Sequence, residues 1–203
     1  MSALFFVLGI PLLGGLALAF YGHRLWARDV NVAFSLGTFL AACFLTNHII
    51  DHGPELLWDR QFYIDPLNVF LVTLTAFVSL TTAIFSRPYM RVEQDHGKMT
   101  PPRMRLYHSM YQLFSFTMLL GFTTNNLGII WVAMEAATLT TVLLVSVYRT
   151  SASLEAAWKY FILCGVGIAQ ALFGTILMYM AADKVLGAEH ATLLWTSLND
   201  VQG

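Results

Sequence analysis

Charged residues are scarce in this sequence. Asp, Glu, Lys and Arg make up only 11% of its 203 residues, whereas a soluble globular domain carries about 25%. Hydrophobic residues account for 57%, and the mean hydropathy is +0.64. The net charge of −1 provides no basic field of the kind that nucleic-acid binding uses. The composition therefore predicts an integral membrane protein in a lipid bilayer, with no nucleic-acid partner.

Cysteines and motifs for bond-making chemistry are also scarce. The two cysteines, Cys43 and Cys164, fall within apolar segments without metal-ligand spacing, so we interpret them as buried thiols. No nucleophile–His–acid arrangement, phosphate loop, haem ligand pair or quinone-type motif is recognisable. We expect no metal, no cofactor and no active site in this chain, which leaves open whether it belongs to an enzyme complex.

The N-terminal segment has no Lys or Arg before Arg24. Because a secretory signal begins with a positive region, we expect the first apolar segment to be retained as a helix. Six such segments predict an all-α integral membrane fold with six transmembrane helices. Their ranges are 3–21, 30–50, 67–85, 107–123, 126–148 and 154–182. In front of the third, Asp65 is expected to be the N-cap and Pro66 to lie in the first turn.

The basic residues alternate between the two ends of these helices. Eight lie after the first, third and fifth segments: Arg24, Arg28, Arg87, Arg91, Lys98, Arg103, Arg105 and Arg149. The opposite side has only Arg60 and Lys184, with Lys159 inside the sixth segment. Since cytoplasmic loops carry the excess of Lys and Arg, we expect the N-terminus outside. Residues 87–105 are predicted to be a cytoplasmic surface loop, and residues 183–203 an outer tail.

Glu135 is the acid most suited to ion chemistry. It lies roughly 13 Å along the fifth helix, near the middle of a ~30 Å hydrocarbon core. Carboxylates at this depth are energetically unfavourable and mark ion pathways. The functional interpretation, which we favour, is a proton carrier whose proton affinity burial has raised. The structural alternative is a carboxylate that accepts hydrogen bonds from the hydroxyls of Thr138 and Thr141.

Lys159 is the second charge inside the membrane. Ser153 is expected to cap the sixth helix, which puts Lys159 roughly 9 Å inside its cytoplasmic end. It can either lower the proton affinity of Glu135 or extend back to the interface. The depths of the two residues differ by ~10 Å, so we expect electrostatic tuning bridged by water and no tight ion pair.

Two polar stripes follow helical spacing. One comprises His108, Gln112 and Ser115 on the fourth helix, and the other comprises Lys159, Gly167, Gln170 and Gly174 on the sixth. Both fit a hydrated relay or, alternatively, interhelical hydrogen bonds and close packing. For the two glycines we favour packing. His108, Gln112, Thr138 and Gln170 are candidate relay residues, and His108 is close enough to the cytoplasmic surface to feed protons inward.

Three runs resemble a known family. They are NNLGIIWVAMEAATLTTVLLVSVY, ending at Tyr148, SLEAAWKYFILCGVG from Ser153, and IDPL from Ile64. Together they resemble the antiporter-like membrane subunits of respiratory complex I, Mrp cation antiporters and membrane-bound hydrogenases. The likeness is greatest to the large antiporter-like subunit of hydrogenase-4-type complexes, and it extends from about Asp65 to Ala182.

The resemblance implies a function. Glu135 would be the family's essential glutamate of helix five, and Lys159 the lysine that tunes it. The chain would be a non-redox subunit that moves protons or Na⁺ in the cell inner membrane, beside other membrane subunits of a hydrogenase or quinone-oxidoreductase complex. Residues 107–182 would begin an antiporter-like repeat, after helices one to three in residues 1–106.

The departure from the family is length. Its subunits have about fourteen helices in two inverted repeats, and this chain stops after the sixth. We therefore expect either a fragment of a longer subunit or a chain that others complete. The alternatives to an ion-translocating subunit are a structural or assembly subunit that does not conduct, and an unrelated small transporter or membrane enzyme. A lone carboxylate suits H⁺ and Na⁺ equally.

Overall fold

Long helices account for most of the molecule. The computed structural model describes residues 2–24, 26–186 and 193–198. Its long helices are α1 (Ser2–Tyr21), α2 (Ala27–His52), α3 (Pro66–Asp95), α4 (Pro101–Thr123), α5 (Leu127–Val145) and α6 (Ser151–Leu186). The short elements are β1 (Glu55–Leu57), β2 (Phe62–Ile64), the 3₁₀ turn η1 (Ser146–Tyr148) and α7 (Trp195–Leu198).

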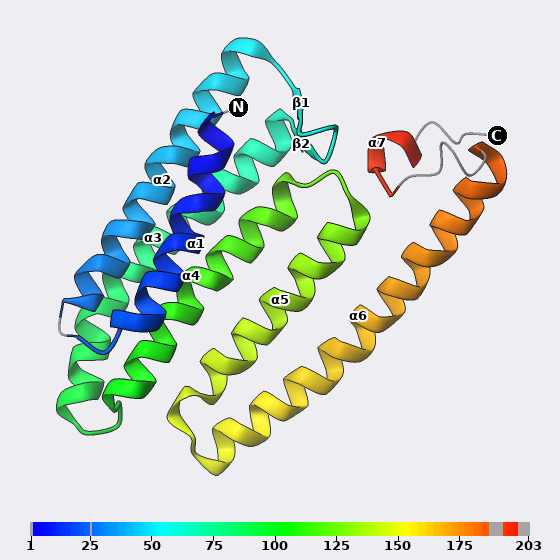
Figure 1. Ribbon diagram of the computed structural model, residues 1–203. Helices are drawn as coiled ribbons and strands as arrows, with labels where there is room; N and C mark the ends of the chain where they lie inside the picture. Colours follow the sequence, from blue (N-terminus) through cyan, green and yellow to red (C-terminus); the bar gives the residue numbers. More distant parts are fainter. Residues whose placement is uncertain (1, 25, 187–192, 199–203) are drawn as a thin grey trace.

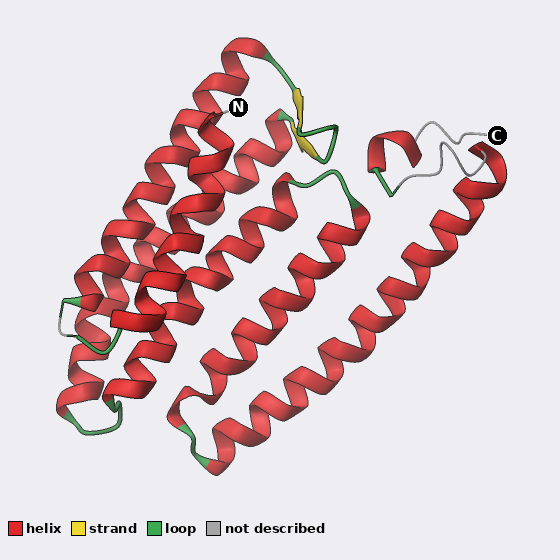
Figure 2. Ribbon diagram, in the orientation of Figure 1, coloured by secondary structure: helices red, strands yellow, loops and turns green. Residues whose placement is uncertain are grey.

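The long helices alternate in direction and pack beside one another (Figure 1). Helix α4 is central because it contacts α1, α3 and α5, while α6 packs on α5 at the edge of the molecule. The connections after α1, α3 and α5 lie at one end of the bundle, and the hairpin of β1 and β2 lies at the other (Figures 1 and 2). The basic residues that the sequence groups together therefore share one end, which we call the arginine-rich end.

Five of the long helices, α1, α2, α3, α5 and α6, are long and apolar enough to cross a membrane. Helix α4 is not among them, although it covers the fourth predicted segment. The all-helical membrane fold is therefore confirmed. Five of the six predicted transmembrane helices thus meet this requirement, and α4 is the one that does not.

The prediction of a loop over residues 87–105 was wrong in extent. Helix α3 continues to Asp95 and α4 begins at Pro101, so residues 96–100 alone form the turn. Beyond the apolar segment, α3 keeps a buried stripe at helical spacing, ending with Ser86, Met90 and Glu93. This stripe packs in part on Met99, Met104 and Val147, which explains why a charged sequence remains helical.

One of the two predicted helix starts is correct. The Asp65 carboxylate accepts a hydrogen bond from the Asn68 backbone N–H at 2.7 Å, which confirms the cap. The prediction of Ser153 as the cap of the sixth helix was wrong, because α6 already begins at Ser151. Thr150 and Ser153 form a reciprocal box, in which the backbone N–H of each donates to the hydroxyl of the other, at 3.0 and 3.1 Å.

The hairpin between α2 and α3 was not predicted. Its turn has three consecutive residues with positive φ, Trp58, Asp59 and Arg60, a conformation that is uncommon without glycine. Asn125 stabilises it by donating its backbone N–H to the Gln61 carbonyl at 2.7 Å and its amide to the Arg60 carbonyl at 2.8 Å. Asn125 also accepts a hydrogen bond from the Trp195 N–H at 2.8 Å. The remainder of the predicted tail, residues 187–192 and 199–203, lies outside the described residues.

Candidate functional site

The start of α5 is fixed by its own cap. The Asn126 side chain accepts a hydrogen bond from the Gly128 N–H at 2.8 Å and donates to the Gln61 side chain at 2.9 Å. This satisfies one of the free N–H groups at the helix start and ties the helix to the hairpin. The depth of every residue on α5 follows from this anchor.

Glu135 lies eight residues after Leu127, roughly 12 Å along α5. Its side chain is half-buried. It makes no ion pair within 4.0 Å and no hydrogen bond to any residue that the structure describes. The carboxylate therefore lies near the middle of α5 and has no partner among the described residues.

The neighbouring hydroxyls do not donate to Glu135. Thr138 donates to the Met134 carbonyl at 3.0 Å, and Thr141 donates to the Ala137 carbonyl at 2.8 Å. Both hydroxyl protons are used within α5 itself, as is common for threonine in apolar helices. The arrangement does not support the structural alternative, in which these hydroxyls would stabilise the carboxylate.

Trp131 fixes the orientation of α5 toward α6. Its indole Nε1–H donates to the Ile168 carbonyl at 2.8 Å. Glu135 follows Trp131 by four residues, so it lies on the same face of α5 and near the seam with α6. Sequence reasoning missed this contact, although the four-residue spacing of Trp131 and Glu135 was a usable signal.

An open pocket of about 580 Å³ lies beside this seam, between α4, α5 and α6. Its otherwise mainly apolar lining, which includes Phe114, has four residues with hydroxyl groups, Thr117, Thr138, Thr141 and Tyr160. No group of three or more His, Cys, Asp or Glu side chains in the described ranges is arranged to hold a metal ion.

Lys159 does not lie beside Glu135. Its ammonium group is exposed and pairs with Glu155 one turn earlier on α6. Lys159 is nine residues before the buried Ile168, which is half a turn around the helix. It therefore lies on the side of α6 that faces away from α5.

Gln170 shares this outer face of α6 with Lys159 and is also exposed. A Cβ atom added at Gly167 or Gly174 would meet nothing within 4 Å. The close packing expected at these two glycines is therefore absent among the described residues. The polar stripe of α6 is not covered by any described part of the chain.

The polar stripe of α4 lies in the core of the bundle. His108 and Gln112 are 1% and 0% exposed. The Gln112 amide donates to the carbonyl and side-chain oxygens of Asn31 at 3.0 and 2.9 Å and to the Ser35 hydroxyl at 3.0 Å. Both ring nitrogens of His108 lack a hydrogen-bond partner among the described residues. Ser115 hydrogen-bonds Ser79 of α3 at 2.9 Å.

This cluster is separated from Glu135 by α4 itself. The α4 residues in the pocket beside α5 include Thr117 and Gly121, which lie about 140° and 180° around the helix from Gln112. The structure thus brings His108 and Gln112 together with α2, and Glu135 and Thr138 together with the α5–α6 seam.

Comparison with known proteins agrees with this arrangement of helices. Residues 124–195 match the family model described as NADH:quinone oxidoreductase/Mrp antiporter, TM. The matched segment contains α5, α6, Glu135 and Lys159. Residues 124–195 belong to this antiporter family.

Two curated relatives extend the likeness. The hydrogenase-4 component F homolog of Methylacidiphilum infernorum is 43% identical over 192 residues, which cover 95% of this chain and 39% of the relative. NADH-quinone oxidoreductase subunit N 1 of Opitutus terrae is 32% identical over 119 residues, which cover 58% of this chain and 21% of the relative. The chain is therefore a multi-pass membrane protein that resembles the first of these relatives over most of its own length, and it spans less than half the length of either.

A solved structure shares the fold. A chain of the membrane-bound sulfane sulfur reductase, an archaeal respiratory membrane complex, superposes with a TM-score of 0.82 at 19% identity. The match covers 99% of this chain and 40% of that one. At this level of identity the likeness shows the arrangement of helices alone.

The Gln112 cluster yields a stability prediction with a matched control. Gln112→Leu removes the donor to Asn31 and Ser35 and leaves buried oxygens unpaired, so we expect a loss of about 1–3 kcal/mol. Gln170→Leu makes the same change on the exposed face of α6 and should alter stability by less than about 0.5 kcal/mol. Thermal unfolding in detergent measures both, and equal effects would contradict the assigned burial.

Proposed function

We propose that this chain belongs to an ion-translocating, non-redox subunit of a redox-driven membrane complex of the complex I or hydrogenase-4 type. Its partners are other membrane subunits of that complex, in the cell inner membrane. Two things support the proposal: the antiporter family of residues 124–195 and the relative called hydrogenase-4 component F homolog. The proposed cargo is H⁺ or Na⁺.

The half-buried, unpaired carboxylate of Glu135 is the observation that carries the proposal. A buried carboxylate that serves the fold is paired or hydrogen-bonded, because an unpaired charge is strongly unfavourable. Glu135 has neither kind of partner among the described residues. A group that must take up and release an ion gains from that arrangement, since no internal partner competes with the ion.

Lys159 is proposed to tune Glu135 from a distance. The Trp131–Ile168 hydrogen bond sets the level at which α5 and α6 align. From that level Glu135 is about 6 Å and Lys159 about 14 Å toward the arginine-rich end, a difference in depth of about 8 Å. With helix axes 8–10 Å apart, the charges are at least about 12 Å apart, and they interact by roughly 1 kcal/mol at an effective dielectric constant of 20.

The candidate relay residues divide into two groups. Thr138 follows Glu135 by three residues, lines the pocket between α4, α5 and α6, and is the proposed next group for an ion leaving that carboxylate. Gln170 lies on the same face of α6 as Lys159, and it would extend an ion path along the side of α6 that faces away from α5. His108 and Gln112 would belong to a separate hydrated region toward α2, and an ion would reach Glu135 from there only around α4.

We also propose six spans with the N-terminus outside, in which residues 107–182 begin an antiporter-like repeat. Helix α4 is less apolar than the other long helices because it carries His108, Gln112 and several hydroxyl residues. These polar groups are covered by neighbouring helices, and polar residues are tolerated in a membrane when they face protein. The excess of basic residues at the end that carries Arg24, Lys98 and Arg149 supports its cytoplasmic placement.

Cysteine labelling tests this topology. In a variant without Cys43 and Cys164, a single cysteine that replaces His96 and a single cysteine that replaces Asp59 should react with a membrane-impermeant maleimide from opposite sides of the membrane. We expect His96→Cys to react only in inverted vesicles and Asp59→Cys only in intact cells. Labelling of both from the same side would rule out the six-span topology.

A structural or assembly subunit is the second candidate. The separation of Lys159 from Glu135 favours it, because a chain kept for assembly would not need the two charges to meet. An uncovered outer face on α6 is also what an assembly subunit would present. Ion uptake by a Glu135 variant distinguishes the two candidates.

Glu135→Gln removes the exchangeable proton while preserving size. In vesicles containing the protein assembled with its partner subunits, we expect coupled ion uptake to fall at least about tenfold while the subunit still assembles. Uptake should be followed both with a proton-sensitive dye and with radioactive Na⁺, because the carboxylate suits either ion.

Asp59→Asn is the matched control, since it neutralises an exposed acid in the hairpin and keeps a residue that tolerates positive φ. It should leave uptake unchanged. Undiminished uptake in Glu135→Gln would favour the structural subunit.

A further inference from the structure

A second pocket, of about 480 Å³, lies at the arginine-rich end of the bundle. Three arginines line it, Arg103 and Arg105 from the first turns of α4 and Arg149 from the turn between α5 and α6. Its lining also includes the apolar side chains of Ala19 of α1 and Leu106 of α4. The pocket thus combines cationic and apolar side chains.

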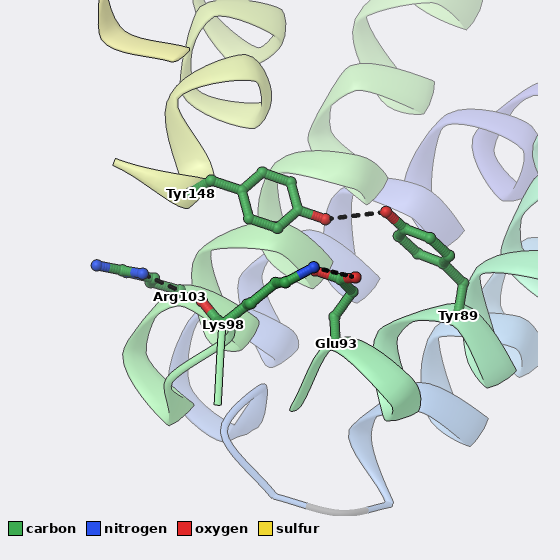
Figure 3. A network of polar contacts seen from close by, with 5 residues as sticks. All are labelled: Tyr89, Glu93, Lys98, Arg103 and Tyr148. Carbon is green, nitrogen blue, oxygen red and sulfur yellow. Dashed lines mark hydrogen bonds and ion pairs between the residues drawn. The ribbon is translucent and has the colours of Figure 1, made fainter. Parts of the chain in front are cut away.

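None of these three arginines has a carboxylate within 4.0 Å in the described part of the chain. Two acids at the same end form ion pairs with other residues, Asp29 with Arg87 and Glu93 with Lys98. Figure 3 shows the Glu93–Lys98 pair beside Tyr148, with the guanidinium of Arg103 extending away from it. The positive charge of the pocket is therefore not neutralised by these neighbouring acids.

The backbone around the pocket is held in place. Arg149 has a φ of 52° and donates its N–H to the Ser146 carbonyl at 3.0 Å, which closes the tight turn after η1. Arg103 donates to the Lys98 carbonyl at 3.1 Å. The end of α1 approaches so closely that a Cβ added at Gly22 would lie 3.0 Å from the Arg105 Cα. These contacts form the pocket before any ligand arrives.

We propose that this pocket binds the phosphate headgroup of an anionic phospholipid from the adjoining leaflet. Guanidinium groups pair with phosphate oxygens in a bidentate manner, and basic pockets between membrane helices favour anionic lipids. The apolar residues of the lining favour a lipid, whose acyl chains would follow α1 and α4 toward the bilayer interior. A free anion would leave these apolar residues without a partner.

Binding of defined lipids to the purified protein tests the proposal. In nanodiscs of phosphatidylcholine with or without phosphatidylglycerol, native mass spectrometry should detect phosphatidylglycerol retained by the wild-type protein. Arg105→Gln with Arg149→Asn should weaken that binding about tenfold. This double variant keeps the Arg103 hydrogen bond, and asparagine tolerates the positive φ at 149. Equal thermal midpoints of variant and wild type in phosphatidylcholine alone would show that folding is intact.

Arg91→Gln is the control, since it removes one charge from the same end outside the pocket, and it should bind phosphatidylglycerol like the wild type. Three outcomes would overturn the proposal. They are equal binding by the double variant and the wild type, equal loss in Arg91→Gln, and thermal stabilisation by inorganic phosphate that matches phosphatidylglycerol. A lipid that binds the isolated protein and is absent from the assembled complex would likewise assign the pocket to a partner subunit.

Discussion

The interior of a bilayer provides no hydrogen-bonding partner, and the placement of polar groups in this bundle follows from that constraint. Among the described helices, α4 carries the most buried polar side chains and lies in the centre, where Asn31, Ser35 and Ser79 supply partners. The threonines of α5 satisfy their hydroxyls on their own helix. Helices at the edge are apolar over most of their exposed surface. A polar residue that escapes this pattern therefore requires a functional explanation.

His108 departs from this pattern, because its ring nitrogens lack partners among the described residues, and so does Glu135. Its helix is anchored at the start by Asn126 and oriented by Trp131, so the carboxylate is held at a fixed depth beside the seam with α6. Lys159 and Gln170 also depart from it, on a face of α6 that none of the described residues covers. The chain spans less than half the length of its relatives, and the proposed ion path would cross this uncovered face.

The order of the helices and much of the polar pattern could be predicted from sequence, because apolar length and helical spacing are local properties. The Asp65 cap has its partner three residues away and was predicted correctly. The hydrogen-bond partners of Gln112 lie 77 and 81 residues away in the sequence. Helical spacing could therefore identify the polar stripe of α4 but could not predict its partners.

For a related reason, the sequence could not show whether the polar stripe of α6 that contains Lys159 faces α5. Periodicity groups Lys159 with Gln170 on one face, but only packing decides whether that face meets α5. The hairpin was missed because three residues with positive φ occur without glycine. The helical extension of α3 was missed because its polarity concealed a buried stripe that ends at Glu93.

Infrared titration of Glu135 tests the central claim most directly. The protonated carboxyl has a carbonyl stretching band, which Glu135→Gln would remove and so identify. The proposed tuning by Lys159 predicts that Lys159→Ala moves the midpoint of this band upward, because a positive charge is removed. A band that stays in place, or a carboxylate that titrates like a free side chain in water, would contradict the account.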